Sequence, residues 1–173
     1  MPNPRGPDHQ QEFEEFAHAR AAQLYRSAWL LCGSHYQAED LVQETLAKVY
    51  ARWRRPFGRI DNPAAYAQTT LTRTFLGGKR RRSDGEQPYA DVPDQAVADP
   101  ATGASVRLAL LQLMAELPPP DRVVLVLRYL EDLSIDEVAD RMGISAGAVR
   151  NRSMRALGRI RGLADDSLRI GKD

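Results

Sequence analysis

Residues 134–161, which read SIDEVADRMGISAGAVRNRSMRALGRIR, constrain the fold more than any other stretch of this 173-residue chain. Ser134 and Glu137 have the spacing of a capping box, and Gly143 stands where a short helix must turn sharply into the next. Ser145 can cap that second helix, in which every charged residue is an arginine. A compact helix pair with an arginine-rich second member predicts a helix-turn-helix that reads the major groove of DNA.

Charge is distributed unevenly along the chain, although the formal net charge is only +1. Basic residues gather in Arg52–Arg59, in Lys79–Arg82 and in the second helix of the pair, whereas acidic residues gather between 84 and 99. Such segregation is typical of a protein that binds nucleic acid with part of its surface. Hydrophobic residues make up 43% of the chain, which is enough to form cores.

Residue usage excludes several classes of site. Cys32 is the only cysteine, so the chain has no disulfide framework and no cysteine-rich zinc site. His9, His18 and His35 lack ligand spacing, and no glycine-rich phosphate loop or nucleophile motif occurs. We therefore expect no metal, no cofactor, no catalytic residues and no enzyme activity. The N-terminus is not a signal peptide and no apolar run approaches the roughly 20 residues that cross a bilayer, so we expect a cytoplasmic protein without membrane insertion.

A change in composition divides the chain into two modules. Residues 84–104 are rich in Pro, Gly, Asp and Ala and contain no Lys or Arg, which predicts a flexible acidic linker. Apolar residues recur at helical spacing on both sides, and no stretch alternates as a strand would. We expect an all-α fold of two small helical domains, residues 10–83 and 105–165.

Cap signals predict where helices begin in the first module. Ser34 and Gln37 have capping-box spacing, and Asn62 followed by Pro63 predicts the start of the next helix. We expect the glycine pair at 77–78 to fray the end of that helix.

The second module is predicted to begin with an apolar stripe. Val106, Leu110 and Leu117 belong to this stripe, which a run of three prolines interrupts before a helix over 121–129. The helix-turn-helix closes the module.

Both modules, in this order, resemble a bacterial extracytoplasmic-function sigma factor of the sigma-70 superfamily, the smallest type of RNA polymerase specificity subunit. The resemblance runs from about Leu24 to Arg161. YRSAWLLCGSHYQAEDLVQETLAKVYARW is similar to the family's core-binding helices, NPAAYAQTTLTRTFLGGKRRRS to its promoter-reading helix, and LPPPDRVVLVLRYLEDLSIDEVADRMGISAGAVRNRSMRALGRIR to its upstream-element reader. The WLLCG start is most similar to the sigma-E-type group of actinobacteria.

The resemblance implies three partners: core RNA polymerase, promoter DNA and an anti-sigma factor. It makes 10–83 the sigma region 2 domain and 105–165 the sigma region 4 domain. In the family, the helix that contains QAEDLVQETL docks on a coiled coil of the largest polymerase subunit. Acidic and amide groups there can pair with arginines across the interface. The core-binding candidates are Asp40, Gln43 and Glu44.

The resemblance also implies that the loop before Asn62 and the helix after it hold the minus-ten element. A loop can form a pocket for an unstacked base, and a basic helix end supplies a cationic track for phosphates. The candidates are Phe57, Arg59, Asp61, Asn62, Arg73, Lys79, Arg80 and Arg81.

The second helix of the helix-turn-helix is expected to read the minus-thirty-five element. Arginine can bridge guanine O6 and N7, and asparagine can pair with adenine. The helix N-terminus can hold phosphate. Ser153 occupies a position that is usually apolar in the family, and we expect its hydroxyl to bond a carbonyl one turn back. The candidates are Ser145, Arg150, Asn151, Arg152, Met154, Arg155 and Arg159, of which Arg152 and Arg159 are expected at phosphates.

An alternative is a stand-alone repressor or activator in which the first module dimerises or senses a signal. A sigma factor starts transcription from a defined promoter with core polymerase, whereas a repressor binds duplex DNA without it. The QAEDLVQET helix and the basic run before the linker favour the sigma factor.

Overall fold

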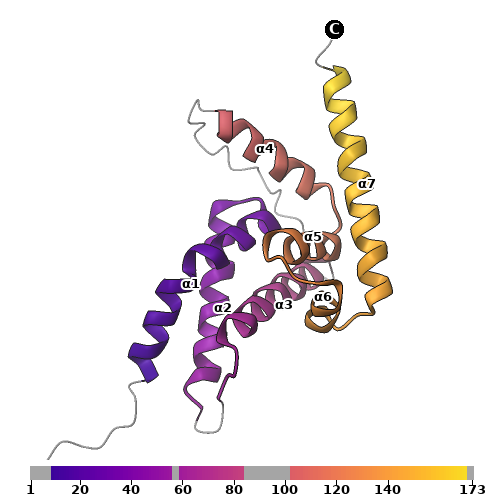
Figure 1. The fold of residues 1–173 in the computed structure, drawn as a ribbon. Coiled ribbons are helices and arrows are strands. Elements are labelled where there is room, and N and C mark those ends of the chain that lie inside the picture. Colours follow the sequence, from indigo (N-terminus) through magenta and orange to yellow (C-terminus); the bar gives the residue numbers. More distant parts are fainter. Residues whose placement is uncertain (1–8, 56–58, 84–101, 171–173) are drawn as a thin grey trace, which may run out of the picture.

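The computed structural model describes residues 9–55, 59–83 and 102–170, and this part of the chain is helical, with no strand. Its elements are α1 (His9–Cys32), α2 (His35–Trp53), α3 (Pro63–Ser83), α4 (Thr102–Ala115), α5 (Pro119–Leu125), the π-helix η1 (Val126–Leu130), α6 (Ile135–Met142) and α7 (Ala146–Ile170) (Figure 1). The expectation of an all-α fold is confirmed. None of the described helices is both long and apolar enough to cross a membrane.

Helices α1, α2 and α3 form the first module, with a core that includes Leu31, Val49 and Leu71. The chain reverses between α1 and α2 at Gly33, whose φ of +73° suits glycine and strains other residues. Asn62 caps α3 as predicted, because its Oδ1 accepts the amide N–H of Ala65 at 3.0 Å.

Two predictions for this module are wrong. Ser34 precedes α2, but its side chain makes no capping hydrogen bond, so the capping box with Gln37 does not form. Helix α3 also continues through the glycine pair at 77–78 to Ser83 without a break. Contacts beside the pair support that end of the helix, since Lys79 lies 6.0 Å from the centre of the Phe75 ring and Phe75 is buried.

The helix-turn-helix in the second module forms as its cap signals predict. Ser134 accepts the amide N–H of Glu137 at 3.2 Å, and the Glu137 carboxylate accepts the amide N–H of Ser134 at 2.8 Å. Gly143 ends α6 in the left-handed conformation, and Ser145 Oγ accepts the amide N–H of Ala148 at 3.1 Å. The capping box therefore sets the direction of α6, and the second cap sets the start of α7.

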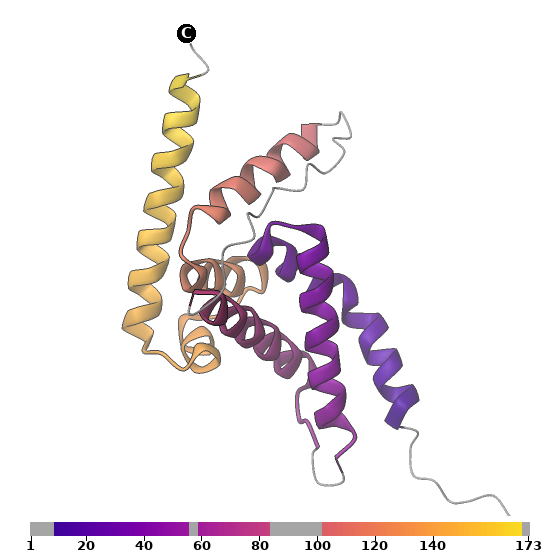
Figure 2. The ribbon, with the colours of Figure 1, turned by 180° about the vertical axis from the view of Figure 1, so that it is seen from behind.

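The remaining helices of the module depart from two predictions. The helix expected over 121–129 begins at Pro119 and widens into the π-helix η1. In α4, Val106 is 65% exposed and Leu110 is 42% exposed, so the apolar stripe is buried only toward Leu117. In Figures 1 and 2 only the C-terminal end of α4 meets the rest of its module, and α4 also contacts α1 of the first module.

The two modules pack against each other. Helices α1 and α3 contact α5, and further contacts join α1 to η1 and α3 to α6. Both ribbon views show these elements side by side at the centre of the molecule, with α7 on its outer side (Figures 1 and 2).

Candidate nucleic-acid interface

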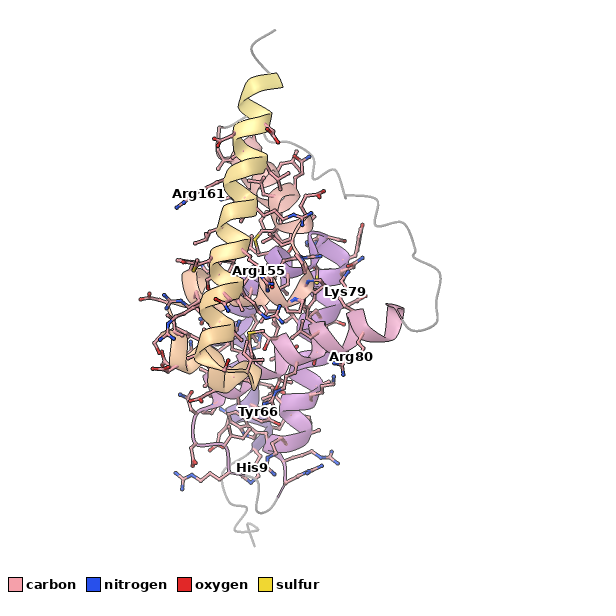
Figure 3. The ribbon with its side chains drawn as sticks, turned by 90° about the vertical axis from the view of Figure 1, so that its right-hand side faces the viewer. His9, Tyr66, Lys79, Arg80, Arg155 and Arg161 are labelled. Atoms are coloured by element: carbon pink, nitrogen blue, oxygen red, sulfur yellow. The ribbon has the colours of Figure 1, made fainter. Side chains whose placement is uncertain are left out.

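One face of α7 presents four candidate residues to solvent. Val149 and Ala156 anchor the opposite face in the core of the helix-turn-helix. Figure 3 views the molecule from the side on which α7 lies, with Arg155 and Arg161 labelled along it. We call the exposed set Arg150, Asn151, Met154 and Arg155 the reading face. Met154 is 71% exposed and lies between the polar members of the set.

Arg152 differs from its neighbours on α7. Its Nη1 donates to Asp121 Oδ1 at 2.8 Å in an ion pair in which the aspartate side chain is 7% exposed and the arginine 31%. Asp121 lies in the first turn of α5, so this pair joins α5 to α7. In the structure Arg152 therefore supports the position of α7 in the module.

Ser145 and Arg159 keep the exposure expected of phosphate contacts. Ser145 Oγ already accepts a helix-capping hydrogen bond, which leaves its hydroxyl proton available to a phosphate oxygen. Ser153 does not behave as predicted. Its Oγ is buried and has no hydrogen-bond partner among the described residues, so the expected bond to a carbonyl one turn back is absent.

A groove of about 750 Å³ lies beside the start of α3. It is lined by Lys48, Arg52, Arg59, Ile60, Asp61, Asn62, Ala65, Tyr66, Thr69, Thr70, Arg73, Thr74 and Arg141, and we call it the minus-ten groove. It brings together four of the residues predicted for the minus-ten element, namely Arg59, Asp61, Asn62 and Arg73. Arginines and lysine outnumber the one carboxylate in the lining, so the groove favours an anionic strand.

Other candidates for this element lie elsewhere. Lys79 and Arg80 are on the C-terminal part of α3, beyond the groove, as Figure 3 shows. Phe57 lies outside the described residues, and so does the side chain of Arg81. The basic C-terminal end of α3 is thus separate from the groove, which lies at the start of α3 and the loop before it.

Sequence reasoning missed several groove residues. Lys48 pairs with Glu44 at 2.7 Å and donates to Thr74 at 3.1 Å, so it bridges α2 and α3 at the groove wall. Arg141 comes from α6 in the other module. Only the packing of the modules brings it to this site, and no local pattern in the sequence marks it.

The candidate core-binding residues share the exposed side of α2. Asp40, Gln43 and Glu44 are exposed, while Leu41 and Val42 beside them are buried. This geometry agrees with the alternation of apolar and acidic residues in the sequence. Glu44 pairs with Lys48, whereas the Asp40 carboxylate makes no ion pair among the described residues.

A small polar cluster marks the start of α2. The Tyr25 hydroxyl lies 2.5 Å from His35 Nδ1, and His35 Nε2 lies 3.2 Å from a Glu39 carboxylate oxygen. Burial raises the pKa of Tyr25, and the nearby Glu39 carboxylate raises it further. The phenol therefore stays protonated and can donate to the imidazole, which fixes the turn between α1 and α2.

The family models that match this chain are Sigma-70 region 2, over residues 16–84, and Sigma-70 region 4, over residues 107–160. The RNA polymerase sigma-E factor of Streptomyces avermitilis is 36% identical over 152 residues, which cover 87% of this chain and 83% of that protein. The ECF RNA polymerase sigma factor SigL of Mycobacterium tuberculosis is 32% identical over 147 residues, covering 79% of this chain and 81% of that protein.

Among solved structures, the fold is similar to the sigma factor RpoE in complex with the anti-sigma factor NepR from Bartonella quintana. That match has a TM-score of 0.71 at 24% identity and covers 90% of this chain and 98% of that one. The sequence relatives and the two region models agree with each other and with the all-helical architecture. The chain belongs to the extracytoplasmic-function (ECF) sigma factors, and it is a promoter-recognising sigma factor of RNA polymerase.

Proposed function

We propose that this sigma factor contacts its promoter through two surfaces that are separate in the fold. The reading face of α7 meets the minus-thirty-five element in the major groove, and the minus-ten groove holds the opened strand. The observation that carries the proposal is the division of α7 into a buried apolar face and an exposed face of two arginines, an asparagine and a methionine. These side chains match base edges, which arginine and asparagine can recognise in a bidentate manner.

The assignment of roles on α7 follows from exposure and pairing. Arg150, Asn151 and Arg155 are proposed to contact bases, and Met154 to contact a thymine methyl group or the sugar edge. Ser145 and Arg159 are proposed to hold phosphates. Arg152 is left out of this set because its guanidinium is already engaged by Asp121.

Replacing Arg150 tests base readout. Arg150→Ala should weaken binding to the minus-thirty-five duplex by about 1–3 kcal/mol and relax the preference at one base pair. Arg161→Ala is the matched control, because it removes an exposed arginine of the same helix outside the reading face. An equal loss on every DNA sequence would make Arg150 a phosphate contact.

For the minus-ten element we propose that Arg59 and Arg73 follow the phosphates and that Asp61 and Asn62 face an unstacked base. Tyr66 lines the same groove and offers a ring for stacking. Lys79 and Arg80 are proposed to continue the phosphate track along α3. Phe57 and Arg81 stay predictions from the sequence.

The core-binding surface is proposed on the exposed side of α2. Asp40, Gln43 and Glu44 can accept hydrogen bonds from arginines of a polymerase coiled coil. Asp40→Lys should weaken the complex with core polymerase by at least about tenfold, since it places a repelling charge at the interface. Glu12→Lys, on the exposed N-terminal part of α1, is the matched charge reversal.

The decisive experiment is in vitro transcription with core polymerase on genomic fragments, with start sites mapped in the presence and absence of the protein. Protein-dependent starts support the proposal. Tight duplex binding without polymerase, and no new start with it, would favour the stand-alone repressor instead.

Two further parts of the proposal come from the family. The polymerisation chemistry belongs to the core enzyme, so this chain contributes recognition and acts in the cytoplasm, where polymerase and chromosome meet. An anti-sigma factor is the proposed third partner, as in the Bartonella quintana complex of RpoE with NepR.

A further inference from the structure

Lys48 lies between the core-binding surface of α2 and the minus-ten groove. Its Nζ is 2.7 Å from Glu44 Oε1, one turn back on α2, and donates to Thr74 Oγ1 on α3 at 3.1 Å. Glu44 belongs to the core-binding surface, whereas Lys48 and Thr74 line the groove. One ammonium group therefore connects a residue proposed for polymerase with the site proposed for DNA.

The groove wall around Lys48 has the groups that hold a phosphate. Arg52 follows Lys48 by one turn of α2, and Arg73 precedes Thr74 on α3, so three cations line this wall. The Thr74 hydroxyl accepts a hydrogen bond from Lys48, which leaves its own proton available to a phosphate oxygen. An ammonium group and a hydroxyl side by side can both donate to one phosphate.

The ion pair between Lys48 and Glu44 is exposed enough to exchange partners. The Lys48 side chain is 45% exposed and that of Glu44 is 53% exposed. A solvated pair at this helical spacing shifts an equilibrium only about twofold. A bidentate bond from an arginine of a partner protein is stronger, so an arginine that binds Glu44 can displace Lys48.

The Glu44 carboxylate opposes DNA binding at this wall in two ways. It neutralises the nearest ammonium group, and it repels a phosphate that approaches Lys48. Binding of an arginine to Glu44 removes both effects at once. Because coupling between two binding sites is reciprocal, a phosphate that binds Lys48 also frees Glu44 for its other partner.

We propose that Lys48, together with the Thr74 hydroxyl, is a further phosphate contact of the minus-ten groove, and that its ion pair with Glu44 competes with this contact until core polymerase binds the Glu44 carboxylate. Docking on polymerase then raises the affinity of the groove for the opened strand. The inference rests on the functions proposed above for the groove and for α2.

The contact is tested first in the free, full-length chain. The probe is a labelled single-stranded DNA that carries the minus-ten region of a promoter mapped by in vitro transcription, and anisotropy measures its binding. Lys48→Met should weaken binding by less than about twofold in wild type, where the ion pair already engages the ammonium group. The same substitution should weaken it about fivefold in a Glu44→Gln background, which is the loss of one hydrogen bond. The difference between the two losses measures the competition.

Salt dependence separates a phosphate contact from a structural role. Glu44→Gln should steepen the dependence of log affinity on log salt by about 0.7, the value for one more phosphate contact on a single strand. Adding Lys48→Met should remove that increase, whereas Lys48→Arg should keep it. Glu15→Gln and Arg26→Met are the matched controls, because each removes one exposed charge of α1 outside the groove lining.

The coupling to polymerase is tested by repeating the titration with the chain saturated by core polymerase. Lys48→Met should now weaken strand binding about fivefold without any change at Glu44, because polymerase occupies that carboxylate. Equal losses in the free chain and in the complex would overturn the coupling.

Arg73→Ala distinguishes failure of this inference from failure of the proposed function. If Arg73→Ala weakens strand binding but Lys48→Met never does so more than Arg26→Met, the phosphate contact at Lys48 is overturned while the function of the groove stands. If the strand does not bind, or binds equally to the Arg73 and Lys48 variants and wild type, the function proposed for the groove fails, and the contact at Lys48 fails with it.

Discussion

The reading face of α7 and the minus-ten groove are built in different ways. The reading face comes from residues within two turns of one helix, and its partner face is buried in the same module. The groove takes Lys48 and Arg52 from α2, Tyr66 and Arg73 from α3, and Arg141 from α6. A surface of the first kind depends on one helix keeping its position, whereas a surface of the second kind depends on how several elements and both modules pack.

The largest expected effect separates two arginines on α7 that look equivalent in the sequence. Arg152→Met should lower the free energy of unfolding by about 2 kcal/mol, because it leaves the buried Asp121 carboxylate without its partner. This expected loss of unfolding free energy is smaller than for a fully buried pair, because the Arg152 side chain is partly exposed. Arg155→Met should leave stability unchanged and weaken duplex binding. Urea unfolding and a DNA titration measure the two quantities for both variants.

The two variants test whether DNA recognition by the reading face depends on the ion pair that holds α7 against α5. The opposite outcome is that Arg152→Met weakens binding equally on every duplex sequence and leaves stability unchanged. In that case Arg152 acts at a phosphate, and its ion pair with Asp121 contributes little to stability. The assignment made from the geometry would then be wrong.

The next effect concerns Asn62, which is both a helix cap and part of the groove. Asn62→Ala removes the hydrogen bond to the Ala65 amide and should cost about 1 kcal/mol in unfolding free energy. Asn62→Ser keeps a capping oxygen and should stay within a few tenths of a kcal/mol of wild type. Both variants should lose affinity for the minus-ten strand. Thermal unfolding and strand binding separate the two roles, and equal stability of the two variants would show that the cap contributes nothing.

Features carried by neighbours in sequence could be predicted. The caps at Asn62, Ser134 and Ser145, the turn at Gly143 and the reading face all follow from spacing within a few residues. Local patterns have a direct physical meaning in helices, since residues three and four apart share a face and short polar side chains satisfy the free amides at a start. Three local predictions fail: Ser34 makes no capping bond although the spacing is right, α3 continues through the glycine pair at 77–78, and the Ser153 hydroxyl does not bond a carbonyl one turn back.

Features that join distant parts of the chain could not be predicted. Asp121 and Arg152 are adjacent only because α5 packs on α7, and Glu131 reaches Ser27 only because the modules pack together. The exposure of Val106 on α4 has the same origin, since periodicity marks an apolar face but does not say what covers it. For this reason the α7 face was predicted almost completely and the groove only in part.

A smaller effect compares two serines of the helix-turn-helix. Ser153→Ala should raise the free energy of unfolding by about 0.5 kcal/mol, because it removes a buried hydroxyl that has no partner among the described residues. Ser145→Ala should lower it by about 1 kcal/mol, since it removes the cap of α7. The opposite signs are measured by urea unfolding of the two variants. A loss on Ser153→Ala would mean that its hydroxyl makes a stabilising contact.

The smallest expected effect is a pH dependence at α6, the helix that packs on α7 and also carries Arg141 to the groove. The backbone N–H of Ser134 donates to Glu137 and, together with the Ser134 hydroxyl and nearby Arg141, holds the pKa of Glu137 below its ordinary value of 4.5. A carboxylate whose pKa is lowered on folding contributes stability above its unfolded pKa and loses it as the pH falls through the folded value. The melting temperature of wild type should therefore exceed that of Glu137→Gln near neutral pH, and the difference should shrink below about pH 4.5. Asp140→Asn, on the same helix without a capping role, controls for the general effect of charge. A difference that stays constant with pH would mean that the charge of Glu137 adds nothing to the capping box.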